Sequence, residues 1–317
     1  MAESKIPLIA IVGPTASGKT SLAVEICKRF GAEAVSCDSM QIYRGMDIAT
    51  AKPTAEEMQG IPHHLIGFLD PDESFSVARY CNLANEVISD INSRGKISVL
   101  VGGTGLYYSS LTDNIEFLPD ETDFEYRDFL KKRAESEGAQ VLLDELCLVD
   151  PEAAKNLHVN NVGRIIRALE IHHTTGKTKT LQNEQSRQNP SPFNTVAICL
   201  DARDRQYLYD RINKRVDLML EAGLLEETKA FFSSPLGRTA RQAIGYKELY
   251  PYFKGEKTLE ECIESLKMQT RRYAKRQLTW FRRDEKIKFF YIDDYSDSSD
   301  LVNAVGEYIE RSLCFEK

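Results

Sequence analysis

Long apolar runs are missing from this 317-residue sequence, and none approaches the roughly 20 residues that a helix needs to span a bilayer. The residues after Met1 do not combine a basic stretch with an apolar core and a small-residue cleavage site, so we expect no signal peptide. The seven cysteines are widely spread and never in C-x-x-C spacing, which disfavours a disulfide scaffold and a zinc knuckle. These absences predict a cytoplasmic protein without a membrane partner.

Net positive charge is also missing. The formal charge of -7 disfavours a nonspecific coat for nucleic acid. It is compatible with a local basic site, because phosphate affinity depends on where the charges lie. With 42% hydrophobic and 28% charged residues, the chain has the composition of an ordinary globular protein. Its length suits one large or two modest domains.

Residues 9–20, IAIVGPTASGKT, contain a glycine-rich loop. An apolar run ends at Gly13, and Gly18, Lys19 and Thr20 follow at the G-x-x-x-x-G-K-[ST] spacing. In this arrangement the backbone N–H groups of the loop face a phosphate, the lysine neutralises charge, and the threonine hydroxyl can ligate Mg²⁺. The loop therefore predicts a polyphosphate site, but its pattern does not separate ATP from another small molecule that carries a diphosphate.

Short apolar runs alternate with helical patterns in the first third of the chain, which predicts a parallel β-sheet with crossover helices. We expect the binding site beyond the carboxyl ends of the strands. Between about residues 118 and 189 helical patterns replace the strand signal, which predicts a helical insertion in a core of residues 1–117 and 190–317. The expected strands are 7–12, 32–37, 96–103, 193–200 and 286–292, and the expected core helices include 20–29 and 77–93.

Three helical patterns fill the predicted insertion. The first carries an apolar stripe that includes Phe129, and Asp150 followed by Pro151 marks the start of a second helix. The third helix ends at Gly176. The stripe of the first helix consists of Tyr126, Phe129, Leu130 and Ala134, and we expect it to face the other helices of the insertion.

Three polar residues follow predicted strands and are candidates for chemistry. Asp38 lies one strand from the phosphate loop, where its carboxylate can act as a general base or can accept local N–H groups in a turn. Thr104, in VGGTGLY, can hydrogen-bond a substrate or can simply belong to a turn. Asp201 is the strand-end acid that fits the metal-binding acid of ATP-hydrolysing enzymes, although it lies far along the chain.

Basic residues concentrate in residues 270–283, TRRYAKRQLTWFRR, which contain no acid. On a helix, Arg272, Arg276, Trp280 and Arg283 fall on one side, opposite an apolar stripe. This pattern suits a nucleic-acid backbone with a stacked base, and it equally suits a solvated basic helix.

A second basic row follows the strand that ends near Asp201. Its arginines can reach the same anion as the phosphate loop, or they can pair with neighbouring aspartates on a solvated face. The row consists of Arg203, Arg205, Arg211 and Arg215.

Seven stretches together resemble the bacterial tRNA dimethylallyltransferase family. They are GPTASGKT, SCDSMQIYRGMDIATAKP, PHHLI, VGGTGLY, RALEI, AIGYKEL and AKRQLTWFR, in the family's order across nearly the whole chain. Many phosphate-binding proteins share the first stretch, whereas the second and the last are much more specific. The resemblance implies an α/β fold, with a parallel sheet like that of P-loop nucleoside-triphosphate hydrolases, flanked by helices and carrying an all-helical insertion.

The resemblance also implies an activity. A dimethylallyl group would pass from dimethylallyl diphosphate to N6 of adenosine 37, next to the anticodon of tRNA, with release of diphosphate. Asp38 would be the general base, Thr104 would orient the acceptor, Lys19 would stabilise the leaving group, and Thr20 would help bind Mg²⁺. The diphosphate would be held by Gly13, Pro14, Thr15, Ala16, Ser17, Gly18, Lys19, Thr20 and Arg215.

The same resemblance implies contacts with the anticodon stem-loop of tRNA, made in part by the insertion. The implied residues are Asp38, Ser39, Met40, Gln41, Thr104, Gly163, Arg164, Ile165, Ile166, Arg167, Gln242, Ala243, Ile244, Gly245, Tyr246, Lys247, Lys275, Arg276, Gln277, Leu278, Thr279, Trp280, Phe281 and Arg282.

Other functions remain as alternatives. An adenylate isopentenyltransferase would prenylate a free nucleotide and need no RNA equipment, a P-loop small-molecule kinase would turn over ATP, and a noncatalytic RNA-binding module would use Asp38 structurally. The sequence departs from the family at Ala49, where glycine is common. We expect a monomer and no metal other than Mg²⁺.

Overall fold

A parallel β-sheet organises the larger part of the chain in the computed structural model, which describes residues 5–117, 123–233, 237 and 239–314. The chain divides into two compact units. The first comprises Met1–Thr112 and Pro192–Lys317, and the second comprises Asp113–Ser191. The sequence placed the insertion between residues 118 and 189, and the first of these limits lies outside the described residues.

The sheet of the first unit has six parallel strands in the order β3-β2-β4-β1-β5-β6. Its central strand β1 pairs with β4 and β5 and is entirely buried from Leu8 to Val12. Apolar strands of this kind are typical of a parallel sheet that is covered on both faces. The five predicted strands are confirmed, and the two-residue β3 is an addition. The bounds are β1 Ile6–Val12, β2 Glu33–Ser36, β3 His63–His64, β4 Ser98–Gly102, β5 Phe193–Asp201 and β6 Lys288–Tyr291.

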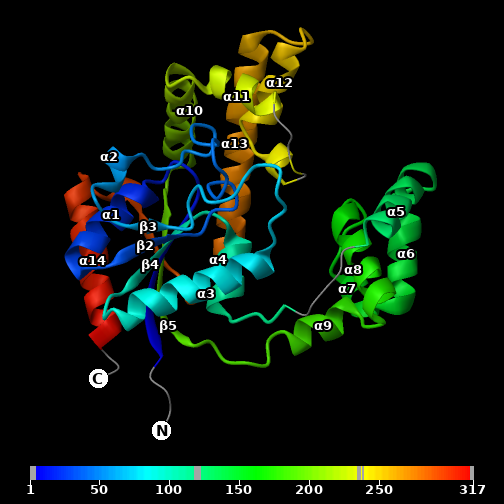
Figure 1. Cartoon of the computed structure of the whole chain (residues 1–317), viewed down its shortest axis with the longest axis horizontal. Coiled ribbons are helices and arrows are strands. Elements are labelled where there is room, and N and C mark those ends of the chain that lie inside the picture. Colours follow the sequence, from blue (N-terminus) through cyan, green and yellow to red (C-terminus); the bar gives the residue numbers. More distant parts are fainter. Residues whose placement is uncertain (1–4, 118–122, 234–236, 238, 315–317) are drawn as a thin grey trace. The chain divides into compact units, whose positions relative to one another are not determined.

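Helices cover both faces of this sheet (Figure 1). On one face α1 (Lys19–Phe30) and α14 (Ser298–Cys314) lie side by side over the side chains that alternate along β1. On the other face α3 (Val77–Ser93) and α4 (Gly105–Thr112) pack over the remaining β1 side chains. The start of α3 is fixed by the Ser76 hydroxyl, which accepts from the Arg79 N–H group. The predicted helices 20–29 and 77–93 are thereby confirmed.

A group of helices from the last third of the chain gathers together in this unit (Figure 1). A small apolar cluster that includes Ala16, Ile212 and Ala274 packs two of them, α10 and α13, against the phosphate loop. Their basic side chains are therefore delivered to the loop. None of the described helices is long and apolar enough to cross a membrane. The bounds are α2 Ala55–Met58, α10 Arg205–Glu221, α11 Leu224–Phe232, η1 Ala240–Gln242, α12 Tyr246–Phe253, α13 Leu259–Phe281 and η2 Ile292–Asp294.

The second unit contains only helices among its described residues. Asp150 caps the helix that begins with Pro151, and Gly176, with φ of 67°, ends another, as predicted. The prediction for Phe129 was wrong, because its side chain is 52% exposed and only Leu130 of that turn is buried. The apolar stripe is wider than the face that the neighbouring helices cover. The bounds are α5 Phe124–Ser136, α6 Ala139–Val149, α7 Pro151–Lys155, α8 Val162–Thr175 and α9 Lys179–Gln185.

Candidate functional site

A cavity of about 860 Å³ lies beyond the carboxyl ends of β1, β2 and β4. It is lined by the phosphate loop, the turn after β2, the turn after β4, and the helices α10 and α13. Most residues predicted for the site in this unit are brought together here. Those that line the cavity are Thr15, Ala16, Gly18, Lys19, Thr20, Asp38, Ser39, Met40, Gln41, Arg215, Gln242, Ala243, Ile244, Gly245, Lys247, Arg276 and Gln277.

The phosphate loop depends on backbone conformations that favour glycine. Gly13 and Gly18 have φ of 142° and 92°. A Cβ atom at Gly13 would lie 2.5 Å from the Leu200 carbonyl oxygen, so only glycine fits against β5. Inside the loop, the Ser17 hydroxyl and the Lys19 ammonium donate to the Pro14 carbonyl oxygen at 2.9 and 2.6 Å. The loop is thus closed on itself before any ligand binds.

Lys19 is held in an unfavourable environment for a cation. Burial, and then the neighbouring Arg215 charge, lower the pKa of Lys19 to about 8, and Asp38 opposes this shift. Burial also lowers the pKa of Arg215. A bound anion would relieve both effects, so this end of the cavity favours a multiply charged anionic ligand.

The structure confirms the turn role of Asp38, one of the two roles that the sequence left open, and places its side chain at the cavity. Its Oδ1 atom accepts from the backbone N–H groups of Met40 at 2.9 Å and Gln41 at 3.4 Å, which is the turn role. Its Oδ2 atom makes no hydrogen bond with the described residues, and the side chain lines the cavity. One oxygen therefore fixes the carboxylate while the other is available to a substrate.

Thr104 connects the turn after β4 to the turn after β2. Its hydroxyl accepts from the Ser39 N–H group at 3.0 Å and lies 3.3 Å from the Ser39 Oγ atom. Thr104 is therefore tied to the turn that carries Asp38, although it does not itself line the cavity.

The three glycines around Thr104 admit close neighbours. A Cβ atom at Gly102 would collide with the Cys37 backbone, and one at Gly103 would collide with the Gln277 amide. At Gly105 it would collide with the Trp280 ring. Gly103 and Gly105 thus let α13 approach the sheet at the level of the cavity, and Gly102 lets the turn after β2 pack against β4.

Gln277 and Trp280 have partners inside the protein. The Gln277 side chain is 6% exposed, accepts from the Thr15 N–H group at 2.9 Å and donates to the Gly103 carbonyl oxygen at 2.9 Å. Trp280 packs against the core and not among the exposed arginines of α13, so its predicted place on the basic side was wrong. The absent side chain of Gly105 is the physical reason.

Only part of the second basic row reaches the phosphate loop. Arg211 donates from Nε to the Ala16 carbonyl oxygen at 2.8 Å, and Arg215 lines the cavity. Arg203 instead pairs with Asp294 at 2.6 Å, and Arg205 is exposed. The first two arginines are therefore the ones placed to meet a ligand.

Asp201 does not resemble a metal-binding acid. It is 1% exposed, its Oδ2 atom accepts from Arg282 at 2.8 Å, and its Oδ1 atom accepts from the Ala202 N–H group. Across the described ranges, no cluster of three or more histidines, cysteines or acids is arranged to hold a metal. The Thr20 hydroxyl makes no hydrogen bond within the described part of the chain, so it is available to a cation that arrives with the ligand.

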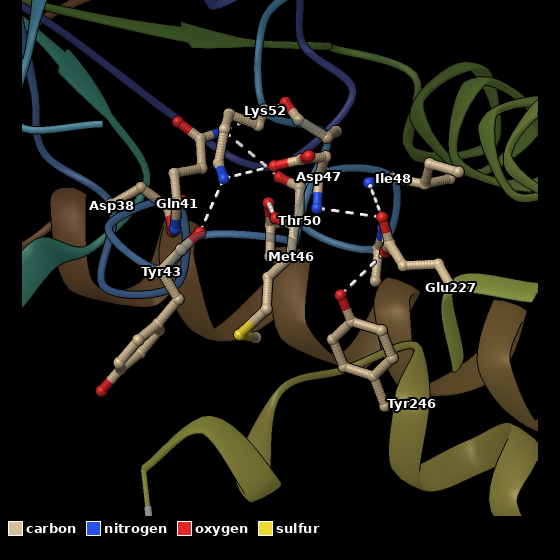
Figure 2. A network of polar contacts seen from close by, with 12 residues as sticks. Asp38, Gln41, Tyr43, Met46, Asp47, Ile48, Thr50, Lys52, Glu227 and Tyr246 are labelled. Atoms are coloured by element: carbon tan, nitrogen blue, oxygen red, sulfur yellow. Dashed lines mark hydrogen bonds and ion pairs between the residues drawn. The ribbon is translucent and has the colours of Figure 1, made fainter. Parts of the chain in front are cut away.

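Residues 47–52 form a wall of the cavity to which sequence reasoning gave no role. The Lys52 ammonium donates to the Tyr43 carbonyl oxygen at 2.6 Å and pairs with Asp47 (Figure 2). The Gln41 amide donates to the carbonyl oxygens of Thr50 and Ala51 at 3.2 and 3.0 Å. The available signal was the stretch DIATAKP, five residues after DSMQ, which contributed to the resemblance only.

Several residues in the predicted tRNA-contacting ranges are core residues. Ile165 and Ile166 are buried within the second unit, and Tyr246 and Phe281 are buried within the first. Their side chains cannot reach RNA in this conformation, because contiguous motif ranges on helices include the inward face. The exposed members of these ranges are Gly163, Arg164, Gln242, Lys247, Lys275, Arg276, Thr279 and Arg282.

The chain matches known protein families along nearly its full length. A family model described as IPP transferase matches residues 41–284, and one described as isopentenyl transferase matches residues 6–67. A tRNA dimethylallyltransferase of Thermoanaerobacter sp. (strain X514) is 48% identical over 98% of this chain and 99% of the relative. The one from Bacillus subtilis (strain 168) is 49% identical over 92% of each chain.

Solved structures are also similar. A full-length tRNA isopentenylpyrophosphate transferase from Bacillus halodurans is 46% identical, with a TM-score of 0.73, over 98% of this chain and 97% of that one. A eukaryotic dimethylallyltransferase solved acting on tRNA is 30% identical, with a TM-score of 0.78, over 96% of this chain and 80% of that one.

Proposed function

The chain belongs to the tRNA dimethylallyltransferase family, and from this premise we propose how its cavity transfers a dimethylallyl group to N6 of adenosine 37 in tRNA. One observation carries the proposal. The phosphate loop and the Asp38 carboxylate line the same cavity, and one Asp38 oxygen is available there. The departing diphosphate and the attacking amine can therefore both be bound in this cavity.

The donor end of the cavity is cationic. Backbone N–H groups of residues 16–20, the Lys19 ammonium and the Arg215 guanidinium would bind the diphosphate of dimethylallyl diphosphate. When bound, Mg²⁺ neutralises charge on this diphosphate, and the Thr20 hydroxyl would help hold it. Because Lys19 and Arg215 are partly buried, their attraction for the charge that develops on the leaving oxygen is screened less than that of exposed side chains.

The acceptor end contains the general base. The exocyclic amine of adenine is a weak nucleophile, because its lone pair is delocalised into the ring. As the new C–N bond forms and the C–O bond to diphosphate breaks, the Asp38 Oδ2 atom would take the proton from N6. The adenine must leave the stacked anticodon loop to reach this point, as in other enzymes that act on a base.

Exposed basic residues would bind the RNA. Lys275 and Arg276 on α13, Lys247 on α12 and Arg164 in the insertion are each able to meet a phosphate, whereas Arg282, directly after α13, is exposed but pairs with Asp201. This equipment supports an RNA acceptor over a free nucleotide. The Asp201 carboxylate already accepts hydrogen bonds from Arg282 and from the Ala202 N–H group, which disfavours a kinase that would hold its metal at Asp201.

The test of the function is a transfer assay. Purified protein with Mg²⁺, unmodified tRNA and radiolabelled dimethylallyl diphosphate should yield labelled N6-isopentenyladenosine after digestion of the RNA, with AMP and ATP as parallel acceptors. Label on AMP alone would move the protein to the nucleotide-prenylating enzymes. Absence of transfer together with ATP turnover would indicate a kinase or an ATPase.

Asp38→Asn tests the base in the same assay. The asparagine oxygen still accepts from the turn N–H groups, whereas the amide cannot accept the N6 proton, so we expect turnover to fall by roughly 10²- to 10⁴-fold. Affinity for tRNA, measured by filter binding, should stay within about twofold. The exposed Glu86→Gln is the matched control for loss of a carboxylate. Weakened tRNA binding with turnover preserved in the bound complex would overturn the assignment.

A further inference from the structure

Glu227, on the first turn of α11, binds three successive backbone N–H groups of the cavity wall. Its Oε2 atom accepts from Asp47 at 3.0 Å and from Ile48 at 2.8 Å, and its Oε1 atom accepts from Ala49 at 2.9 Å (Figure 2). Successive N–H groups that converge in this way form a concave site for an anion. Here the anion is a carboxylate from the protein itself.

A fourth donor completes the environment of this carboxylate. The Tyr246 hydroxyl donates to Glu227 Oε1 at 2.8 Å, while its ring is buried and stacked on Phe231 with centroids 4.0 Å apart. Burial, and then the Glu227 charge, raise the pKa of Tyr246, so this hydroxyl stays a donor. Glu227 is therefore held from both sides and has little freedom to turn away.

The segment that Glu227 binds is a rigid turn. Within it, the Ala51 and Lys52 N–H groups each donate at 2.9 Å, to the Ile48 and Asp47 carbonyl oxygens, and Ala51 adopts the left-handed φ of 48°. An alanine in this region is held there by its surroundings. Moving residues 47–49 would therefore move the rest of the turn with them.

The turn is in contact with the residues that hold Asp38. Gln41 spans the distance, because its side-chain amide donates to the carbonyl oxygens of Thr50 and Ala51 while its backbone N–H group donates to Asp38. Figure 2 shows Asp38 and Gln41 on one side of the 47–52 turn and Glu227 on the other. No atom of Glu227 itself lines the cavity.

We infer that Glu227 is a positioning residue, which fixes the 47–52 turn and, through Gln41, the orientation of the Asp38 carboxylate. The inference rests on the proposed function, because Asp38 matters as a base only if the amine of adenine is the acceptor. Glu227 touches neither substrate and acts through the backbone. Its removal should therefore lower the rate of the chemical step and leave the affinities for diphosphate and tRNA in place.

The experiment compares Glu227→Gln with wild-type full-length protein in single-turnover transfer of labelled dimethylallyl to saturating tRNA. The Gln side chain keeps the shape but presents an NH₂ group to backbone N–H groups, which loosens the turn. A misplacement of about 1 Å costs on the order of a hundredfold in rate, so we expect a loss of about tenfold to a hundredfold per folded molecule. The Kd values for Mg²⁺-diphosphate and for tRNA should stay within about twofold of wild type.

Glu226→Gln is the matched control, because this neighbouring glutamate is exposed on the same helical turn and does not line the cavity described above. It should keep the wild-type rate. A wild-type rate in Glu227→Gln would overturn the inference, as would a loss that only follows the folded fraction measured by thermal melting. Weaker tRNA binding with an unchanged rate in the bound complex would assign Glu227 to RNA binding instead.

Two further comparisons distinguish failure of this inference from failure of the proposed function and from misfolding of the variant. If wild-type protein transfers no label, the proposed function fails, whereas transfer by wild type with an equal rate in Glu227→Gln refutes this inference alone. If Glu227→Gln does not fold, Tyr246→Phe keeps the ring on Phe231 and removes one hydrogen bond from the carboxylate. It should lower the single-turnover rate by roughly twofold to tenfold, and a wild-type rate would contradict the inference.

Discussion

Lys19 lies beside another cation, Arg215, before any anion reaches it. With a pKa of about 8, a large part of the lysine is neutral in free protein slightly above that pH. Diphosphate restores the usual preference for the charged form, so binding at pH 8.5 should be accompanied by proton uptake at Lys19. Titration calorimetry in two buffers of different ionisation enthalpy measures this uptake, and Lys19→Met subtracts the protons taken up by diphosphate itself. Equal uptake by both proteins would contradict the shift.

The lowered pKa of Lys19 also changes how the free energy of unfolding depends on pH. Between about pH 8 and the ordinary lysine pKa of 10.5, the unfolded chain holds a proton that the folded protein has released. The free energy of unfolding of ligand-free protein should therefore rise with pH in this window, and Lys19→Met should remove that contribution. Urea titrations at pH 7.5 and 9.5 measure the difference between the two proteins. A parallel pH dependence in both would show that Lys19 is not responsible.

At the scale of single residues, the sequence predicted which residues form the phosphate loop. It did not predict the contacts that distant side chains make with them. The spacing of Gly13, Gly18 and Lys19 was enough to place a phosphate loop, because local backbone geometry determines its function. The role of Gln277 was not predictable, because its partner Thr15 lies 262 positions away in the chain. Glu227 gave no signal for the same reason, since its three N–H partners lie about 180 positions upstream.

At the scale of elements, the inner face of α13 makes structural hydrogen bonds, whereas its outer face presents basic side chains. Gln277 on the inner face connects the phosphate loop to the turn after β4, while Lys275 and Arg276 are exposed. Gln277→Leu should leave the Thr15 N–H group and the Gly103 carbonyl oxygen without a partner. We expect the Kd for Mg²⁺-diphosphate and the KM for dimethylallyl diphosphate to rise about tenfold, with tRNA affinity within about twofold.

Lys275→Gln is the converse control on the same helix. It removes one exposed charge, so tRNA should bind more weakly, with a shallower dependence on salt, while the diphosphate Kd should not change. If Gln277→Leu instead weakens tRNA and spares diphosphate, Gln277 contacts RNA directly as the family resemblance implied.

The elements themselves were largely predictable. Buried parallel strands are continuous apolar runs, so β1, β4 and β5 stood out in the sequence. The strand β3 is only His63–His64, and such a short element has no periodicity to detect. Phe129 was predicted on the buried side of its helix but is exposed. Periodicity identifies the apolar face of a helix, but it does not show how much of that face the neighbouring helices cover.

At the scale of the whole molecule, the insertion leaves and rejoins the chain at neighbouring points. The Asn114 amide donates to the Pro190 carbonyl oxygen at 3.1 Å, and the Glu116 N–H group donates to the Ser186 carbonyl oxygen at 2.9 Å. A short Gly-Ser linker in place of residues 117–185 should therefore close the gap at little entropic cost. We expect the shortened protein to bind Mg²⁺-diphosphate like wild type and to bind tRNA about tenfold or more weakly, with loss of transfer.

Diphosphate calorimetry and filter binding of tRNA on the same preparation decide between the outcomes. Wild-type tRNA affinity and transfer in the shortened protein would remove the insertion from RNA recognition. Loss of diphosphate binding as well would show that the first unit depends on the insertion to fold.

The close packing around Thr104 also limits how the chain can change over evolutionary time. At positions 102, 103 and 105 a side chain would collide with the Cys37 backbone, the Gln277 amide and the Trp280 ring, respectively. A larger residue at 105 becomes acceptable only after Trp280 has become smaller, so the two positions are epistatic. In VGGTG, Gly103 and Gly105 therefore accommodate a helix from the far end of the sequence, whereas Gly102 and Thr104 contact the residues around the turn that carries Asp38.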